Sequence, residues 1–292
     1  MRVAKLYETS EKPVVSLEFF PPRDEKAEEK FDKIVDGLAK LEPDYMSVTF
    51  GAGGSTRDGS YKTVDKLFTE KKQPTVAYIA GYGLGPDEIK EVLDKYKNLG
   101  IETIFVIRGD EPRNDDFTSH SDSFNYASEM ISFINEHYDF DLGCAGYPEG
   151  HIQAESLEKD IEFLKLKVDN GAKYVVAQYC YDNNYFFNYL EKCRAAGISV
   201  PVIPGIMPVY TVKLTNILAK VCGAMITDEL KSKLDELAEA DKDDVLNYGI
   251  DFAVKQCGEL LKSGVPGLHF YTMDREKSVT EIVNRLRQEN LL

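Results

Sequence analysis

The feature that most constrains the fold is a repeated unit: a short β-branched or aromatic run, a polar turn, then an amphipathic helical stretch. The runs begin, in chain order, at Val14, Tyr45, Pro74, Thr103, Asp141, Tyr174, Val200 and Gly267. Subtracting successive start positions gives spacings of 31, 29, 29, 38, 33, 26 and 67 residues, so each interval except the last has room for one strand and one helix. Short strands that alternate with helices predict a parallel sheet.

The segments between the runs have the period and the end signals of helices. Phe31–Leu41 places apolar side chains at 31, 34, 35, 38 and 41, which is one helical face. Pro86–Leu99 opens with a proline and two acids and stops at Gly100, as helices commonly begin and end. The segment that contains Glu162–Val168 ends at Asn170-Gly171, another helix stop, just before the sixth run.

The last interval is long enough for more than one helix. Helical patterns occur at Thr211–Val221 and Leu246–Lys262, and a stretch rich in Asp, Glu and Lys lies between Asp228 and Asp244. We expect that charged stretch to be a solvated helix.

Eight strand–helix units over 292 residues fit a (β/α)8 barrel, the TIM barrel. The alternative is a doubly wound open sheet, which usually carries a glycine-rich fingerprint after its first strand. Here the first run continues as Glu18-Phe19-Phe20-Pro21-Pro22, with no glycine. We therefore predict an α/β protein of one domain, a (β/α)8 barrel over residues 1–292 with no regulatory domain.

Composition excludes several classes of function. Acidic residues outnumber basic ones 50 to 35, for a formal charge of −15, which argues against a dedicated nucleic-acid binder. No apolar stretch is long enough for a membrane span, and the first residues lack a signal-peptide core, so we expect a cytoplasmic protein. The five cysteines are scattered without a C-x-x-C pair, and the four histidines are equally dispersed. We expect free thiols and no metal site.

Chemistry-bearing residues follow most of the predicted strands. In a barrel the active site lies at the carboxyl ends of the strands, so these side chains should converge on one rim. None of these strand ends carries a lysine for Schiff-base chemistry or a cluster of metal ligands. The set suits a flat heteroaromatic ligand with a phosphate and one proton transfer, such as a flavin or a pterin. Its members are Glu18, Thr49, Arg108, Asp110, Tyr147, Gln178, Tyr271 and Arg275.

Several of these segments together resemble the methylenetetrahydrofolate reductase family. The match runs in order from about residue 14 to 275. Its segments are Ser16-Leu17-Glu18-Phe19-Phe20-Pro21-Pro22, Ser47-Val48-Thr49-Phe50-Gly51-Ala52, Arg108-Gly109-Asp110, Tyr147-Pro148-Glu149-Gly150-His151, Pro204-Gly205-Ile206-Met207-Pro208 and His269-Phe270-Tyr271-Thr272. The resemblance implies a barrel that binds a flavin, usually FAD with FMN open, and reduces 5,10-methylenetetrahydrofolate to 5-methyltetrahydrofolate. NADH or NADPH would supply the hydride, and we expect a homo-oligomer.

The resemblance also assigns roles to residues. Glu18 matches the general acid that protonates N10 of the substrate, and we expect its neighbours Leu17, Phe19 and Phe20 to shield the carboxyl from water. Asp110 matches a carboxylate beside the flavin and the pterin, and Gln178 a residue that hydrogen-bonds the pterin and the nicotinamide. Tyr271 and Arg275 match the substrate side. The positions that match flavin contacts are Thr49, Arg108, Gly109, Asp110, Tyr126, Ala127, Tyr147, His151, Asp160 and Lys167.

Two departures from the family pattern motivate an alternative. The third run reads Thr75-Val76-Ala77-Tyr78, followed by a glycine-rich loop over 81–85, where the family commonly has His-Leu-Thr-Cys. Val212 stands where some members carry a phenylalanine that packs on the ligands, and Tyr210 is a candidate to compensate. The alternative is a folate- and flavin-binding subunit that receives electrons from a partner protein such as ferredoxin. A flavin-free reductase is a third hypothesis.

Overall fold

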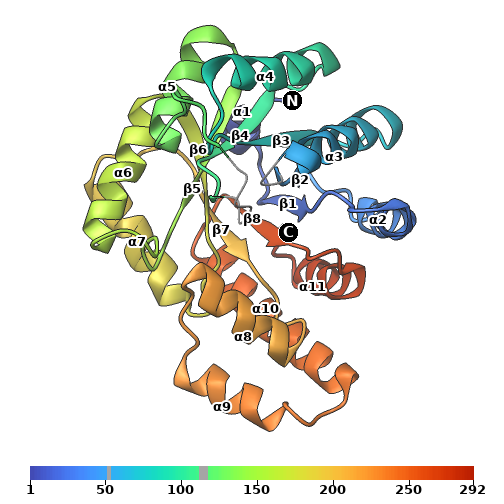
Figure 1. Cartoon of the computed structure of the whole chain (residues 1–292). Helices are drawn as coiled ribbons and strands as arrows, with labels where there is room; N and C mark the ends of the chain where they lie inside the picture. The colour runs from blue at the N-terminus through green and yellow to red at the C-terminus, as the bar shows by residue number, and fades with distance from the viewer. Residues whose placement is uncertain (51–53, 112–117) are drawn as a thin grey trace.

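The protein is a closed barrel of eight parallel strands. The computed structural model describes residues 1–50, 54–111 and 118–292, without the side chains of 54–57. Each strand pairs with its neighbours in chain order, and β1 closes the barrel against β8 (Figure 1). The predicted (β/α)8 barrel and all eight strands are confirmed. The strands are β1 (Val14–Phe19), β2 (Tyr45–Val48), β3 (Thr75–Ala80), β4 (Thr103–Ile107), β5 (Asp141–Gly146), β6 (Ala172–Ala177), β7 (Val202–Ile206) and β8 (Gly267–Tyr271).

Helices surround the barrel, as Figure 1 shows. They are α1 (Val3–Thr9), α2 (Glu25–Ala39), α3 (Gly54–Asp65) with the π-helical turn η1 (Lys66–Glu70), α4 (Pro86–Leu99), α5 (Ala127–His137), α6 (Leu157–Asp169), α7 (Asn183–Ala195), α8 (Val212–Cys222), α9 (Asp228–Glu236), α10 (Lys242–Lys262) and α11 (Glu276–Gln288). The predicted stop of α4 is confirmed, because Gly100 adopts φ +94°. A left-handed residue of this kind favours glycine.

Side chains along each strand alternate between two cores. On β1, Leu17 and Phe19 face outward, and the Phe19 ring meets Phe31 of α2 edge-on at 5.7 Å. The intervening residues Ser16 and Glu18 face the barrel interior. Burying an outward aromatic contributes about 2 kcal/mol, so this outer layer anchors the helices on the barrel. The same alternation fixes which side chains can reach the mouth.

Helix α1 covers the amino-terminal end of the barrel, which the sequence analysis did not anticipate. The amides of Val3 and Ala4 donate to Thr103 Oγ1 (3.3 Å) and Asp141 Oδ2 (2.6 Å), at the first residues of β4 and β5. The Tyr7 hydroxyl lies 3.2 Å from that of Tyr45. Since this end is covered, a ligand has its approach from the carboxyl ends of the strands.

Three helices separate β7 from β8, as the two helical patterns and the charged stretch between them indicated. The charged stretch holds α9 as expected, but the helix is only half solvated: Leu230 and Leu234 are buried in a separate apolar cluster beside α8 and α10. Helix α10 begins at Lys242, earlier than the apolar pattern alone indicated. None of the helices in the described ranges is both long and apolar enough to cross a bilayer.

Candidate active site

The residues predicted at strand ends lie at the carboxyl rim of the barrel. Backbone bonds hold two of them in place: Thr49 N donates to Phe19 O (3.0 Å), and Gln178 N donates to Gly146 O (2.8 Å). Arg108, Gly109 and Asp110 follow β4, and Tyr271 ends β8. Two residues of the matching pattern, Gly51 and Ala52, lie outside the described residues. The parallel topology therefore brings segments from the whole chain to one rim.

Glu18 is the buried acid at this end of the barrel, with 6% of its surface exposed. Its Oε2 accepts a hydrogen bond from the Tyr78 hydroxyl at 2.6 Å and lies 3.4 Å from His269 Nε2. No hydrogen bond from the described residues reaches the other oxygen, Oε1. One oxygen is thus held by the protein, and the other is available for proton exchange with a ligand.

The expected shielding of Glu18 by its chain neighbours is wrong. Leu17 and Phe19 point to the helices, because successive strand residues face opposite sides, and Phe20 is 42% exposed. The side chains that do shield Glu18 come from other strands: Tyr78 on β3 and His269 on β8. The sequence pattern indicated no role for either residue, although His269 stands two positions before Tyr271, on the same face of β8.

His269 also contacts Ser16, which lies below Glu18 on the same face of β1. Ser16 Oγ is 2.8 Å from His269 Nδ1 and donates to Leu268 O at 3.3 Å. The tautomer decides the roles of the ring nitrogens: with the proton on Nδ1, Ser16 accepts and Nε2 is an acceptor, and with the proton on Nε2, that nitrogen donates toward Glu18 Oε2. Ser16 is fully buried, so it is not placed to attack a ligand, and the three side chains form a Ser–His–Glu chain that ends at the Glu18 carboxyl.

Tyr271 and Arg275 are joined through Tyr210. The Tyr210 hydroxyl donates to Tyr271 O (2.9 Å), and the Arg275 guanidinium lies over the Tyr210 ring at 5.5 Å. Tyr210 is 4% exposed, so its ring packs under Arg275 and is not presented to a ligand as a stacking surface. The hypothesis that Tyr210 replaces the family's phenylalanine is therefore not supported by this arrangement, while Arg275 itself is exposed.

Basic side chains gather around Tyr147, beyond the ends of β4 and β5. Lys167 Nζ donates to Ala145 O (2.6 Å) and lies 5.9 Å from the centre of the Tyr147 ring. The His151 ring meets Tyr147 edge-on at 4.7 Å. Burial lowers the pKa of His151, and the positive charges of Arg108 and Lys167 lower it further. Both basic side chains therefore lie near His151.

This basic cluster has the donor chemistry for a pyrophosphate. Among the described residues, neither Arg108 nor Lys167 has a carboxylate within ion-pair distance, and Arg108 Nε donates to the carbonyl of Gly109 at 3.2 Å. The two permanent cations lie together at the rim, and an anionic ligand would pair with both. Burial raises the pKa of Asp160, and Lys167 opposes that rise, so Asp160 borders the same cluster.

The remaining predicted contacts form the outer rim. Asp110 is exposed, yet its charge adds to the rise that burial causes in the pKa of Tyr147 and opposes the fall that burial causes in the pKa of His151, so it lies near both rings. Tyr126 is 59% exposed, and Ala127 begins α5 beside it. The structure thus groups Arg108, Asp110, Tyr147, His151, Asp160 and Lys167 on the β4–α6 side and Glu18 with Tyr271 on the β1–β8 side, where the Glu18 charge raises the pKa of Tyr271.

The glycine-rich loop after β3 is not arranged to bind a phosphate. Gly81 N donates to Ile107 O (3.3 Å), and Gly85 N donates to Glu88 Oε2 (2.9 Å) in a capping box. These amides are used, and the first turn of α4 is acidic, which disfavours an anion. The loop instead packs beside Gly109: at φ +83°, a Cβ there would lie 3.0 Å from Ala80 Cβ and 3.5 Å from Tyr82 Cβ.

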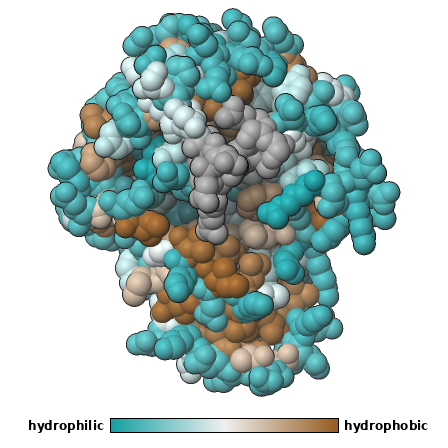
Figure 2. Space-filling view, viewed as in Figure 1, coloured by the Kyte–Doolittle hydropathy of each residue, from teal (hydrophilic) through white to brown (hydrophobic). Residues whose placement is uncertain are grey.

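A hydrophobic rim borders the mouth on the α8 side. Figure 2 shows hydrophobic residues gathered on the lower half of this face of the molecule. Ile217 and Val221 of α8 and Met225 after it are 48%, 60% and 56% exposed. Ile152, 66% exposed, reaches them from the loop before α6, because a Cβ on Gly223 would lie 2.6 Å from its Cγ2.

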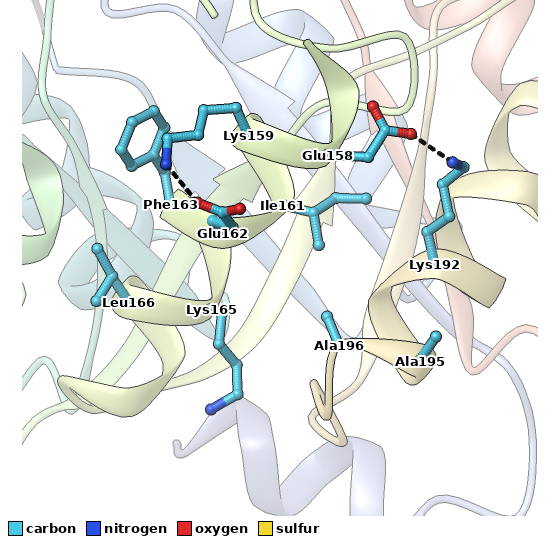
Figure 3. A pocket seen from close by; sticks show the side chains of 10 residues that line it. All are labelled: Glu158, Lys159, Ile161, Glu162, Phe163, Lys165, Leu166, Lys192, Ala195 and Ala196. Carbon is cyan, nitrogen blue, oxygen red and sulfur yellow. Dashed lines mark hydrogen bonds and ion pairs between the residues drawn. The ribbon is translucent and has the colours of Figure 1, made fainter. Parts of the chain in front are cut away.

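A second hollow lies on the outer surface, between α6 and α7 (Figure 3). Its lysines are already neutralised: Lys159 pairs with Glu162 at 2.5 Å, and Lys192 pairs with Glu158 at 2.6 Å. It therefore differs from the rim cluster, whose cations lack such partners among the described residues.

Glu149 connects the loop after β5 to the segment after α8. Its Oε1 accepts from Met225 N at 2.9 Å, and burial raises the pKa of Glu149 to about 6, with a smaller contribution from Asp182. The folded state therefore holds the proton more tightly than the unfolded chain. The resulting stability is complete below about pH 4.5 and is lost as the pH rises through about 6.

Glu149→Gln should remove this pH dependence while keeping an oxygen for Met225 N. Between about pH 4.5 and 6 the free energy of unfolding of the variant should gain about 1 kcal/mol on the wild type, a figure discounted for partial exposure. Urea unfolding of both proteins at several pH values measures the difference. A constant difference across that range would contradict the assignment.

The fold and the site define a class: a (β/α)8-barrel protein with a buried acid and a cluster of basic side chains at its carboxyl rim. The family model described as methylenetetrahydrofolate reductase matches residues 2–287. The chain therefore belongs to the methylenetetrahydrofolate reductase family.

Individual relatives agree with this membership. The chain is 34% identical to methylenetetrahydrofolate reductase 1 of Schizosaccharomyces pombe, over 94% of this chain and 46% of that protein. It is 31% identical to 5,10-methylenetetrahydrofolate reductase of Escherichia coli K12, over 93% of this chain and 90% of that one. The chain thus spans about half the length of the yeast relative and most of the bacterial one.

A solved structure has the same fold. A Clostridium thermocellum protein, described as uncharacterized and as binding two copies of 5-methyl-5,6,7,8-tetrahydrofolic acid, superposes with a TM-score of 0.66 over 98% of both chains. At 17% sequence identity this likeness supports the fold alone.

Proposed function

We propose that this protein reduces 5,10-methylenetetrahydrofolate to 5-methyltetrahydrofolate, with a bound flavin that takes its hydride from NADH or NADPH. The observation that carries the proposal is the joint presence, at one rim, of a buried acid held by Tyr78 and His269 and of a cation cluster without carboxylate partners among the described residues. Family membership makes the folate the substrate of choice for such a site.

The proposed reaction begins with Glu18. Its carboxyl gives a proton to N10 of the bound substrate, the bond from N10 to the bridging carbon breaks with its electron pair left on N10, and a cationic iminium forms at N5. His269 Nε2 lies 3.4 Å from Glu18 Oε2, next to the carboxylate that remains after the proton has left. Asp110, a carboxylate on the same rim, would stabilise the cation, and Gln178 would hold the pterin through its amide. Tyr271 and Arg275 would lie toward the rest of the substrate.

The residues present fit a flavin dinucleotide. Arg108, Lys167 and His151 would hold its pyrophosphate, and Asp160 would accept from ribose hydroxyls. Thr49, Gly109, Tyr126, Ala127 and Tyr147 would complete the contacts. When bound, the flavin supplies hydride transfer from the nicotinamide to the iminium carbon. FAD rather than FMN is our expectation, because the cluster extends from the rim onto α6 and a second phosphate would use it.

A second candidate function is favoured by the hydrophobic rim. Ile152, Ile217, Val221 and Met225 expose a patch beside the mouth, a feature typical of surfaces that other proteins contact. In this version the protein binds folate and flavin but receives electrons from a partner such as ferredoxin. The homo-oligomer and the cytoplasmic location remain expectations.

Visible spectroscopy of the purified protein tests both candidates. We expect a yellow protein whose flavin band bleaches on anaerobic addition of NADH or NADPH and returns when 5,10-methylenetetrahydrofolate is added. Bleaching by reduced ferredoxin but by neither nucleotide would favour the second candidate. A colourless preparation that still reduces the folate would favour direct hydride transfer and contradict the flavin assignment.

A further inference from the structure

Tyr78 lies against the proposed acid from β3, the strand whose sequence departs from the family pattern. Its hydroxyl donates to Glu18 Oε2 at 2.6 Å, a length typical of a hydrogen bond to an ionised oxygen. Tyr78 and Glu18 are 6% exposed each, so water does not compete for the bond. The contact joins β1 to β3 across the intervening strand β2.

The barrel holds this tyrosine in a fixed position. Its ring stacks on Phe105 of β4, with centroids 4.5 Å apart and planes 24° from parallel, which stabilises the pair by about 1 kcal/mol. On β2 the residue in register with Glu18 is Ser47, whose small side chain leaves room for the tyrosine to reach across. The hydroxyl is therefore aimed at Glu18 by packing on one side and by open space on the other.

We propose that Tyr78 is a positioning residue for Glu18: its hydroxyl holds Oε2, turns Oε1 toward the substrate and stabilises the carboxylate that remains after the proton has left. The inference rests on the proposed function, since it assigns a device to the same acid. A phenol donates one hydrogen bond to a carboxylate and gains strength as that carboxylate becomes charged. The stabilisation is thus larger after proton transfer than before it, which is what accelerates a step.

Other groups also face Glu18, and their interactions with its carboxyl remain when Tyr78 is changed. They are His269 and Tyr271 from β8 and Tyr45 from β2. Of the tyrosines, Tyr78 donates a hydrogen bond to the carboxylate, whereas the Tyr45 hydroxyl lies beside that of Tyr7. Removing the Tyr78 hydroxyl should therefore remove one hydrogen bond from the Glu18 carboxylate while the other groups that face it stay in place.

Tyr78→Phe should slow reduction of the folate by the reduced protein roughly tenfold and move the alkaline limb of that step up by about one pH unit. Without the donor, the neutral acid is favoured and keeps its proton to higher pH. Reduction of the bound flavin by the nucleotide should not change. Stopped-flow measurement of the two half-reactions from pH 5.5 to 9 gives both readouts, and an unmoved limb would overturn the proposal.

Tyr174→Phe is the matched control. Tyr174 is fully buried in the same interior, lies 6.0 Å from the same Phe105 ring, and its hydroxyl has no hydrogen-bond partner among the described residues. It loses the same atom without touching Glu18, so both half-reactions and the limb should match the wild type. An equal shift in both variants would mean a general effect of the interior and would overturn the specific role of Tyr78.

An infrared titration separates this inference from the proposed function, because it needs no substrate. The difference between wild type and Glu18→Gln isolates the Glu18 carboxyl band, and the pH at which that band converts should rise by about one unit in Tyr78→Phe. If Tyr78→Phe does not fold, 3-fluorotyrosine at position 78, a stronger donor, should move the conversion to lower pH. An unmoved band refutes the Tyr78 contact; a wild type that reduces no folate refutes the proposed function and with it the catalytic use of that contact.

Discussion

Glu18→Gln abolishes folate reduction and leaves the flavin half-reaction intact: this is the largest functional effect we expect. An amide cannot give its proton to N10, and general acids contribute about 10²- to 10⁴-fold, so the rate with 5,10-methylenetetrahydrofolate should fall by roughly 10³-fold. Flavin reduction by NADH or NADPH should stay within about twofold, because it needs no proton at N10. Anaerobic stopped-flow absorbance follows each half-reaction separately.

Two further variants make this result specific. Glu18→Asp keeps a carboxyl but withdraws it from Tyr78 and His269, so it should retain a small part of the folate rate. Glu111→Gln makes the same chemical change at an exposed carboxylate beside Asp110 and should leave both half-reactions unchanged. If Glu18→Gln slowed the two half-reactions equally, Glu18 would be holding the flavin or the fold, and its role as an acid would be wrong.

The order of the strands was predictable because it depends on sequence patterns within each strand and helix. The start spacings anticipated all eight strands, and the signals at Pro86 and Gly100 located both ends of α4. These features depend on residues near one another in the chain, such as a proline in the first turn or a glycine at positive φ. The positions of the rim residues Thr49, Arg108 and Gln178 were predictable too, since a residue at the carboxyl end of a barrel strand lies at the mouth of the barrel.

The partners of Glu18 were not predictable in this way. Tyr78 and His269 are 60 and 251 residues from Glu18, and both stand inside apolar strands where a tyrosine or a histidine is most often a core residue. Only the register of β1 with β8, which pairs Ser16 with His269, and the reach across β2 bring them together. The chain neighbours of Glu18 were misleading for the same reason: they belong to the outer face.

The helices after β7 show the corresponding limit for charge patterns. A run rich in Asp, Glu and Lys predicted a solvated helix, yet Leu230 and Leu234 recur with helical spacing and face an apolar cluster. The same cluster continues toward the exposed rim residues of α8. Charge alone could not locate it, because a helix needs only a few apolar side chains on one face to be anchored.

Gly205→Ala is the second large effect, and it acts on both stability and the site. Gly205 faces the interior on β7, where a Cβ would lie 2.3 Å from the carbonyl oxygen of Ala177 and 2.6 Å from the Tyr271 ring. The first contact is with backbone, which cannot rotate away. We expect a loss of about 3 kcal/mol in the free energy of unfolding, and displacement of Tyr271 should weaken folate binding. Urea unfolding and the KM for the folate measure the two effects.

Gly258→Ala provides the control with the opposite sign. Gly258 lies inside α10, and a Cβ there would make an ordinary contact, 3.6 Å from Leu291 Cδ1. Because alanine is a better helix former than glycine, this variant should be more stable by about 0.5–1 kcal/mol. The same added methyl group thus destabilises the barrel wall and stabilises the outer helix. Only in the wall would the methyl group clash with a backbone atom, which cannot move aside. Equal stability changes in the two variants would show that the space beside Tyr271 can relax, and that Gly205 does not set the position of this side of the site.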